Sequence, residues 1–238
     1  MSAGAGGRAA DPALDWARIA LVVFDLDGTL YDARRLRWRM AAWLLADAGL
    51  RKEVDFLRLQ YRLPAERVGC RPGELQAWVE DWMEARPLRH LAACRRPGVG
   101  ALFDALHAQG KRVAVLSDYP ARDKLVALGL EADIVLWAGD AGVGRLKPHP
   151  RGLRQILART GIGAERTLVV GDRADRDAAV AAQVGAQAVL VGRPVRGAQH
   201  GRAATHSDAA IWIRGFDDPL FAPLFSPDLS PATAATAG

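Results

Sequence analysis

Two aspartates separated by one residue, Asp25 and Asp27, follow an apolar run in the stretch VVFDLDGTLYD, residues 22–32. Two carboxylates held this close repel each other, and one of them tends to take up a proton. A folded protein can accommodate such a pair by binding a divalent cation, or by dividing nucleophilic work from proton transfer. The pattern alone is equally compatible with two surface aspartates at a strand end, so other residues must decide.

Further polar residues of suitable types occur later in the chain. Gly28 allows a sharp turn that brings backbone N–H groups close to a ligand. The others are Thr29, Ser117 and Asp118 in LSD, Lys147 in GRLKPHP, and the aspartates of GDRADRD at 171–177. Mg²⁺ prefers hard oxygen ligands, and a lysine supplies a positive charge to phosphate oxygens. Together these residues favour Mg²⁺-assisted phosphoryl transfer, in which catalysis consists mostly of positioning and charge neutralisation.

An alternation of strand-like and helix-like segments would bring these residues together. Apolar runs that predict strands lie at 19–24, 112–118, 133–140, 167–172, 187–193 and 209–215, and helical spacing lies at 121–130, 150–161 and 177–186. This alternation predicts an α/β fold with a Rossmann-like, doubly wound parallel sheet. In such sheets ligands bind at the carboxyl ends of the strands, which is where the polar residues lie.

The segment between the first two strands has a different pattern. Residues 33–96 show helical spacing only, which predicts a small all-helical domain inserted after the first strand. Tryptophans that could supply its apolar faces are Trp38, Trp43, Trp78 and Trp82. The core domain is then expected at 19–32 and 97–222, with a disordered leader at 1–18 and a disordered tail at 225–238.

Composition is that of an ordinary soluble globular protein, with 50% hydrophobic and 25% charged residues. The apolar runs are far shorter than the roughly 20 residues of a membrane span, and no signal-peptide pattern is present. We therefore expect a cytoplasmic protein with no membrane partner, either a monomer or a homodimer. The two cysteines, Cys70 and Cys94, show no metal-binding spacing and are expected to be reduced.

The net charge of +5 and the pI of about 9.7 raise the question of nucleic-acid binding. Most of the excess lies in one segment, 32–96, where four arginines alternate with apolar residues: Arg34, Arg35, Arg37 and Arg39. That pattern is typical of the solvated face of an amphipathic helix, and some of these arginines could attract an anionic substrate. No DNA- or RNA-binding motif is visible, so no nucleic-acid partner is expected.

With these motifs in their order, the chain resembles the haloacid dehalogenase-like (HAD) superfamily, most of whose members are phosphatases. The resemblance covers roughly residues 20–193. DLDGT at 25–29 resembles the first family motif, and LSD at 116–118 the second. Lys147 in LKPHP resembles the third motif, and GDRADRD at 171–177 the fourth. The helical insert matches the position of the family's α-helical cap, as in phosphoglycolate phosphatase-like members.

The resemblance implies catalytic roles for several of these residues. Asp25 would be the nucleophile that forms an aspartyl-phosphate, and Asp27 would protonate the leaving group and later accept a proton from water. Thr29 and Ser117 would hold phosphate oxygens, with Gly28 in the same loop. Lys147 would neutralise the nucleophile and the phosphoryl group.

The resemblance also implies a Mg²⁺ cofactor held by Asp25, the backbone carbonyl of Asp27, and Asp172. The second acid of the fourth motif is expected to be Asp177, because of its spacing in GDRxxxD, with Asp175 as the alternative. Asp118 stands where many members have asparagine. It is placed among the substrate-binding residues, although its carboxylate would be unfavourable beside a phosphate unless it pairs with a base.

Within the superfamily, the residue two positions after the nucleophile separates the chemistries. An acid there, Asp27, suits phosphate monoesters, because an alkoxide leaving group needs a proton and a halide does not. A phosphonatase would need a lysine from the cap, where Lys52 is the only one between 33 and 96. We therefore expect a Mg²⁺-dependent phosphatase acting on a small phosphorylated metabolite. A phosphosugar mutase of the same superfamily and a catalytically silent binding protein remain the alternatives.

Overall fold

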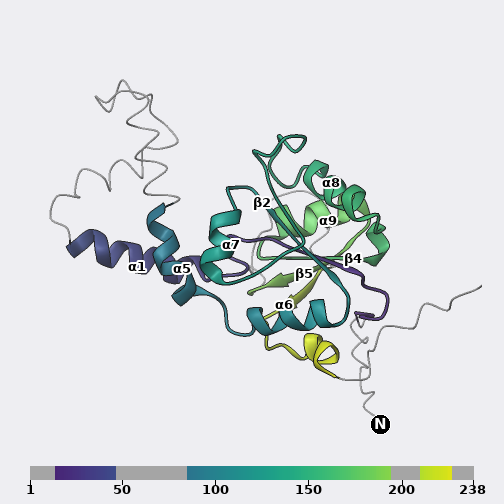
Figure 1. Cartoon of the computed structure of the whole chain (residues 1–238), viewed down its shortest axis with the longest axis horizontal. Coiled ribbons are helices and arrows are strands. Elements are labelled where there is room, and N and C mark those ends of the chain that lie inside the picture. The colour runs from purple at the N-terminus through teal and green to yellow at the C-terminus, as the bar shows by residue number, and fades with distance from the viewer. Residues whose placement is uncertain (1–13, 47–84, 194–209, 227–238) are drawn as a thin grey trace, which may run out of the picture.

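The computed structural model describes residues 14–46, 85–193 and 210–226 (Figure 1). Its centre is a six-stranded sheet in the order β3-β2-β1-β4-β5-β6, in which every neighbouring pair is parallel. The strands are β1 (Leu21–Phe24), β2 (Arg112–Ser117), β3 (Ile134–Trp137), β4 (Thr167–Gly171), β5 (Gln187–Val191) and β6 (Ile211–Ile213). The predicted α/β class and parallel sheet are confirmed, and each strand lies within a segment that the sequence predicted.

Helices cover both faces of the sheet, so β1 is buried along its whole length. The covering helices are α6 (Val99–Ala108), α7 (Arg122–Leu128), α8 (Arg151–Thr160) and α9 (Ala179–Val184). Figure 1 shows α8 and α9 on one side of the sheet and α6 on the other. Leu21 and Val23 of β1 join the core with α8 and α9, while Val22 and Phe24 join the core with α6 and α7. Side chains of a strand alternate between its faces, so this short apolar run supplies both cores.

The described part of the predicted insert is helical. It comprises α1 (Ala33–Ala46) and α5 (Arg86–Cys94), and α5 packs against both α1 and α7. Asp32 caps the N-terminus of α1. Its Oδ1 atom accepts hydrogen bonds from the backbone N–H groups of Arg34 at 2.9 Å and Arg35 at 3.1 Å. Residues 47–84, with Cys70, Trp78 and Trp82, lie outside the described residues, so the cap domain stays a prediction.

Trp38 was expected to supply an apolar packing face of this insert. The residue is 75% exposed on α1, and the rest of the insert, 47–84, lies outside the described residues, so its packing stays a prediction. The arginines of the same helix, Arg34, Arg35, Arg37 and Arg39, are also exposed. Helical spacing predicts a periodic face, but it does not say which elements cover that face.

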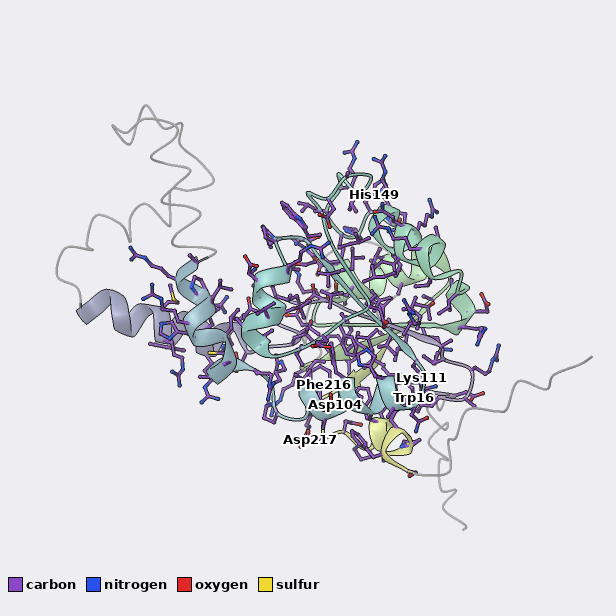
Figure 2. All side chains as sticks on the ribbon, viewed as in Figure 1. Trp16, Asp104, Lys111, His149, Phe216 and Asp217 are labelled. Atoms are coloured by element: carbon purple, nitrogen blue, oxygen red, sulfur yellow. The ribbon has the colours of Figure 1, made fainter. Side chains whose placement is uncertain are left out.

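The core also extends further toward the N-terminus than its predicted start at residue 19. Leu14 and Trp16 are buried, and the indole N–H of Trp16 donates to the carbonyl of Leu220 at 2.7 Å. The buried Lys111 donates from Nζ to the carbonyls of Trp16 and Ile19 at 2.7 and 2.8 Å. Trp16 and Lys111 lie together near α6 in Figure 2. Residues 14–18 are thus held in place by hydrogen bonds as well as by apolar contact.

The C-terminal described residues complete the same core. A 3₁₀ helix, Pro219–Phe225, buries Phe221 and Leu224 beside α6. Phe216, which Figure 2 places near α6, stacks at a tilt on Phe24 and Phe221 with ring centroids 6.3 and 6.0 Å apart. Of the described helices, none has both the length and the apolar character needed to cross a membrane.

Candidate active site

The sheet order places the ends of three strands side by side. β1 lies between β2 and β4, and Phe24 is in register with Val115 on one side and Val170 on the other. The N–H of Asp25 continues the ladder by donating to the carbonyl of Val170 at 2.8 Å. The residues that follow β1, β2 and β4 therefore meet at one edge of the sheet, where the strand order reverses and ligands bind in such folds.

Asp25 lies in the middle of this edge and is buried. The hydroxyl of Thr29 donates to its Oδ2 atom at 2.7 Å, and Nζ of Lys147 contacts its Oδ1 atom. Burial raises the pKa of Asp25 to about 7, an effect that Lys147 opposes and the nearby Asp177 carboxylate reinforces. A cation is needed to keep this carboxylate ionised as a nucleophile.

Lys147 supplies one such cation from the loop before α8. Its ammonium pairs with Asp25 and, at 2.7 Å, with Oδ1 of Asp177. Burial alone would lower the pKa of Lys147, but these two carboxylates outweigh it and hold that pKa above its ordinary value. Lys147 is therefore a fixed positive charge at the end of β1.

Asp118 supports Lys147 from the end of β2. Its Oδ1 atom accepts a hydrogen bond from the backbone N–H of Lys147 at 2.8 Å, and its Oδ2 atom pairs with Arg176 at 2.7 Å. The negative charge of Asp118, which the sequence suggested would be unfavourable beside a phosphate, is thus paired with Arg176. Both carboxylate oxygens are engaged by the protein, and a direct contact with substrate stays a prediction.

The structure separates the two candidates for the second acid of the fourth motif. Asp177 is buried, and its Oδ2 atom accepts hydrogen bonds at 3.1 Å from the backbone N–H groups of Asp172 and Arg173. Asp175 is 67% exposed at its side chain and pairs with Arg173 at 2.6 Å. A π-helical turn at Ala174–Ala178 turns Asp177 inward. Asp177 therefore belongs to the cluster, and Asp175 does not.

Asp27 lies beside the cluster and has different partners. Its Oδ1 atom accepts from the hydroxyl of Tyr31 at 2.5 Å and from Nζ of Lys124 at 2.9 Å. Its Oδ2 atom faces the buried hydroxyl of Ser117 at 3.4 Å. The two aspartates of DLDGT thus have separate environments, which suits a division of labour between them.

Three of the carboxylates have the chemistry of a cation site. Asp25, Asp172 and Asp177 each offer an oxygen, and these oxygens lie within 4.8 Å of one another. Burial and the nearby Asp177 carboxylate raise the pKa of Asp172 to about 6, and no hydrogen-bond donor to its side chain is found in the described part of the chain. Lys147 provides one positive charge for three carboxylates, so these residues fit a hard divalent cation such as Mg²⁺. The Asp27 carbonyl as a further ligand stays a prediction.

Gly28 allows this close arrangement. Its φ of +98° lies in the left-handed region, and a Cβ atom here would lie only 2.3 Å from Oδ2 of Asp172. The guanidinium of Arg96 holds the Gly28 carbonyl, donating to it from Nη2 at 2.8 Å. A methyl group at position 28 would therefore displace the Asp172 carboxylate from the DLDGT loop.

Four further residues contact the site, although the sequence patterns predict no catalytic role for any of them: Tyr31, Lys124, Arg96 and Arg176. For Lys124 a signal existed, because it follows Ala121 and precedes Leu125 and Leu128 on the buried stripe of α7. A lysine in such a stripe needs a buried partner. The partner, Asp27, lies 97 positions earlier in the chain, and sequence spacing alone could not identify it.

A family model of haloacid dehalogenase-like hydrolases matches residues 19–185 of this chain. The chain belongs to this family. The match spans all four motifs, so the predicted membership is confirmed. In this haloacid dehalogenase-like hydrolase, the aspartates of the motifs and Lys147 lie at the sheet edge described above.

Relatives of this hydrolase include two named phosphatases. Phosphoglycolate phosphatase of Rhodospirillum rubrum is 37% identical over 98 residues, which is 40% of each chain. Phosphoserine phosphatase of Thermus thermophilus is 39% identical over 77 residues, 32% of this chain and 30% of the relative. These matches span less than half of the length of either relative.

The fold itself extends over nearly the whole of a solved structure. A HAD phosphatase from Thermococcus onnurineus superposes with a TM-score of 0.56 at 22% identity, covering 81% of this hydrolase and 93% of that chain. At this level of identity the likeness shows the fold alone.

Proposed function

We propose that this hydrolase is a Mg²⁺-dependent phosphatase that cleaves a small phosphate monoester through an aspartyl-phosphate on Asp25. One observation carries the proposal. Asp25 contacts Lys147 and Thr29 at the sheet edge where the strand order reverses. Asp27 lies in the same loop but has a different hydrogen-bond partner, Tyr31. This arrangement supplies a nucleophile, a charge for the phosphoryl group and a proton donor.

The reaction would proceed in two steps, transfer of the phosphoryl group to Asp25 and hydrolysis of the aspartyl-phosphate. In the first, an oxygen of Asp25 attacks phosphorus, the bond from phosphorus to the leaving oxygen breaks with its electron pair, and Asp27 protonates that oxygen. In the second, Asp27 takes a proton from a water molecule whose oxygen attacks phosphorus. The bond from phosphorus to Asp25 then breaks, which releases inorganic phosphate and restores Asp25 as a carboxylate and Asp27 as the protonated acid.

The surrounding groups would stabilise the negative charge of the phosphoryl group in the transition state. Lys147 would neutralise the nucleophile and the incoming phosphoryl oxygens. The hydroxyls of Thr29 and Ser117, which donate to Asp25 and Asp27 in this structure, would turn to donate to those oxygens when substrate binds. Asp25 and Asp172, with Asp177 behind them, would hold Mg²⁺, which would supply additional positive charge to the phosphoryl group. Asp177 fixes Lys147 and the loop that carries Asp172.

The choice of a phosphate ester rests on Asp27 and on the relatives. A carboxylic acid two residues after the nucleophile is useful where an alkoxide leaves. The phosphatases of Rhodospirillum rubrum and Thermus thermophilus are named for two different small phosphate esters, so they support the class of substrate and leave its identity open. Residues 47–84, where a cap would contribute substrate contacts, lie outside the described residues.

The test is hydrolysis of p-nitrophenyl phosphate, followed by a panel of alkyl phosphates that includes phosphoglycolate and phosphoserine. Activity is expected with Mg²⁺ and should be lost with EDTA and in Asp25→Asn. Asp175→Asn is the matched control, because it removes an aspartate charge from an exposed position outside the cluster. A folded protein that binds Mg²⁺ but hydrolyses no member of the panel would overturn the proposal in favour of a binding protein.

A further inference from the structure

The two oxygens of Asp27 are not equivalent. Oδ1 receives two donors, the Tyr31 hydroxyl at 2.5 Å and the Lys124 ammonium at 2.9 Å. Among the described residues, Oδ2 has only the Ser117 hydroxyl, at 3.4 Å, which is longer than an ordinary O–H···O bond. One oxygen is anchored, and the other remains available.

Both anchoring groups are buried. Tyr31 is 5% exposed and forms an antiparallel bridge with Arg95. Lys124 is 8% exposed, because α7 packs its neighbours Leu125 and Leu128 into the core. The clamp is therefore built into the scaffold before any ligand binds, as precise positioning requires.

We propose that Lys124 and Tyr31 are positioning residues, which fix Asp27 through Oδ1 so that Oδ2 exchanges the proton during phosphate-ester cleavage. The inference rests on the proposed function, because it assigns the two oxygens of Asp27 within that reaction. In the first step the Oδ2–H bond breaks as the leaving oxygen takes the proton. In the second step Oδ2 regains a proton from the attacking water.

The chemistry of the carboxyl group supports this assignment. A carboxyl group protonated at Oδ2 keeps an unprotonated oxygen at Oδ1, which still accepts from both Tyr31 and Lys124. The clamp therefore persists in both halves of the reaction, and Asp27 need not reorient between them. A proton on Oδ1 would have to displace one of the two donors.

Substrates whose leaving groups differ in basicity can distinguish a role in positioning Asp27 from general damage to the site. An alkoxide must be protonated as it departs, whereas p-nitrophenolate departs as a stable anion. The comparison is made in kcat/KM, which reports the steps up to formation of the aspartyl-phosphate and not the later attack of water that all substrates share. In kcat/KM, a residue that positions the acid should matter for alkyl phosphates and matter little for p-nitrophenyl phosphate. A residue needed only for folding or for phosphate binding should affect both substrates equally.

Lys124→Met and Tyr31→Phe remove each donor while keeping most of the side-chain volume. With the alkyl phosphate that the wild type cleaves fastest, kcat/KM is expected to fall by about ten- to a hundredfold in Lys124→Met, since general acid catalysis contributes about 10²–10⁴ and misplacement forfeits part of it. With p-nitrophenyl phosphate the loss should stay under about threefold by the same reasoning. Lys124→Arg retains the charge and should recover part of the alkyl-phosphate activity.

Arg122→Met is the matched control. Arg122 lies on the same helix, is exposed, and donates to the carbonyl of Val135 at 3.3 Å rather than to the site. The substitution removes the same charge from α7 and should leave both rates unchanged. Equal losses on the two kinds of substrate in Lys124→Met, or no loss on the alkyl phosphate, would overturn the inference.

Crystal structures of the wild type and Lys124→Met provide a second measurement that needs no activity. The Asp27 carboxylate is expected to rotate or to adopt more than one orientation once Lys124 is lost. An unchanged orientation would overturn the inference even if the phosphatase proposal holds. If the wild type cleaves no phosphate ester, the proposed function fails, and the orientation of Asp27 still decides whether Lys124 positions it.

Discussion

Gly28 and Asp172 approach so closely that a Cβ atom on Gly28 would lie 2.3 Å from Oδ2 of Asp172. The contact joins the loop after β1 to the loop after β4, and it sets the separation of two carboxylates proposed to bind a cation. Gly28 therefore matters for the spacing of the site as well as for the turn that it forms.

Gly28→Ala should damage both the site and the stability of the protein. The positive φ is expected to cost about 1–2 kcal/mol in the free energy of unfolding, and displacement of Asp172 should weaken Mg²⁺ binding by at least about tenfold. Gly110→Ala is the control, because Gly110 also has a positive φ, +67°, but a Cβ atom added there would have no neighbour within 4 Å. Thermal unfolding and Mg²⁺ titration should show loss of stability in both variants and loss of Mg²⁺ affinity in Gly28→Ala alone.

Asp177→Asn and Asp175→Asn should differ sharply, although both remove one charge from the same turn. Asp177 orients Lys147 and two backbone N–H groups, so its loss is expected to reduce kcat/KM by about ten- to a hundredfold. Asp175 forms an exposed pair with Arg173, and such pairs contribute about 0–1 kcal/mol. Steady-state kinetics with p-nitrophenyl phosphate checks the prediction, and similar losses in both variants would contradict it.

Two substitutions of Asp118 distinguish the contribution of its hydrogen bond to Lys147 from that of its ion pair with Arg176. Asp118→Asn keeps an oxygen for the Lys147 N–H and loses the charge facing Arg176, so activity should fall by less than about fivefold. Asp118→Ala removes both contacts and should cost about ten- to a hundredfold, because Lys147 loses its backbone support. If the two variants behave alike in kcat/KM, the charge rather than the hydrogen bond is what matters.

The metal-free protein should lose stability as pH rises from about 4 to about 7. Burial is the main cause that raises the pKa of Asp25 to about 7 and that of Asp172 to about 6, from an ordinary value of 3.8. In this window the folded protein binds more protons than the unfolded chain, so the free energy of unfolding falls with increasing pH. The raised pKa of Lys147 acts above this window.

Mg²⁺ should oppose this loss, because it competes with protons for the same carboxylates. The rise in melting temperature caused by Mg²⁺ is therefore expected to be larger at about pH 8 than at about pH 5. Asp172→Asn should remove most of the rise at either pH. Thermal unfolding with and without Mg²⁺ measures this, and a Mg²⁺ effect that is independent of pH would contradict the assigned ligands.

The local pattern of the sequence specifies the strands and the residues at their ends. The run 167–172 is short and apolar because the strand that forms within it, β4, is buried along its whole length. The order of the motifs along the chain then indicates which polar residues meet at the sheet edge. Asp25, Asp172 and Asp177 meet there in the structure.

The partner of each of these residues is set by packing in three dimensions. The spacing in GDRxxxD favours Asp177 over Asp175, and a π-helical turn is what brings Asp177 into the cluster. Lys124 reaches Asp27 across 97 positions, and Arg176 reaches Asp118 across 58. Such contacts depend on how α7 and the loop after β4 pack on the sheet. Strand and helix patterns are local, whereas the pairing of buried charges depends on contacts between segments that are distant in sequence.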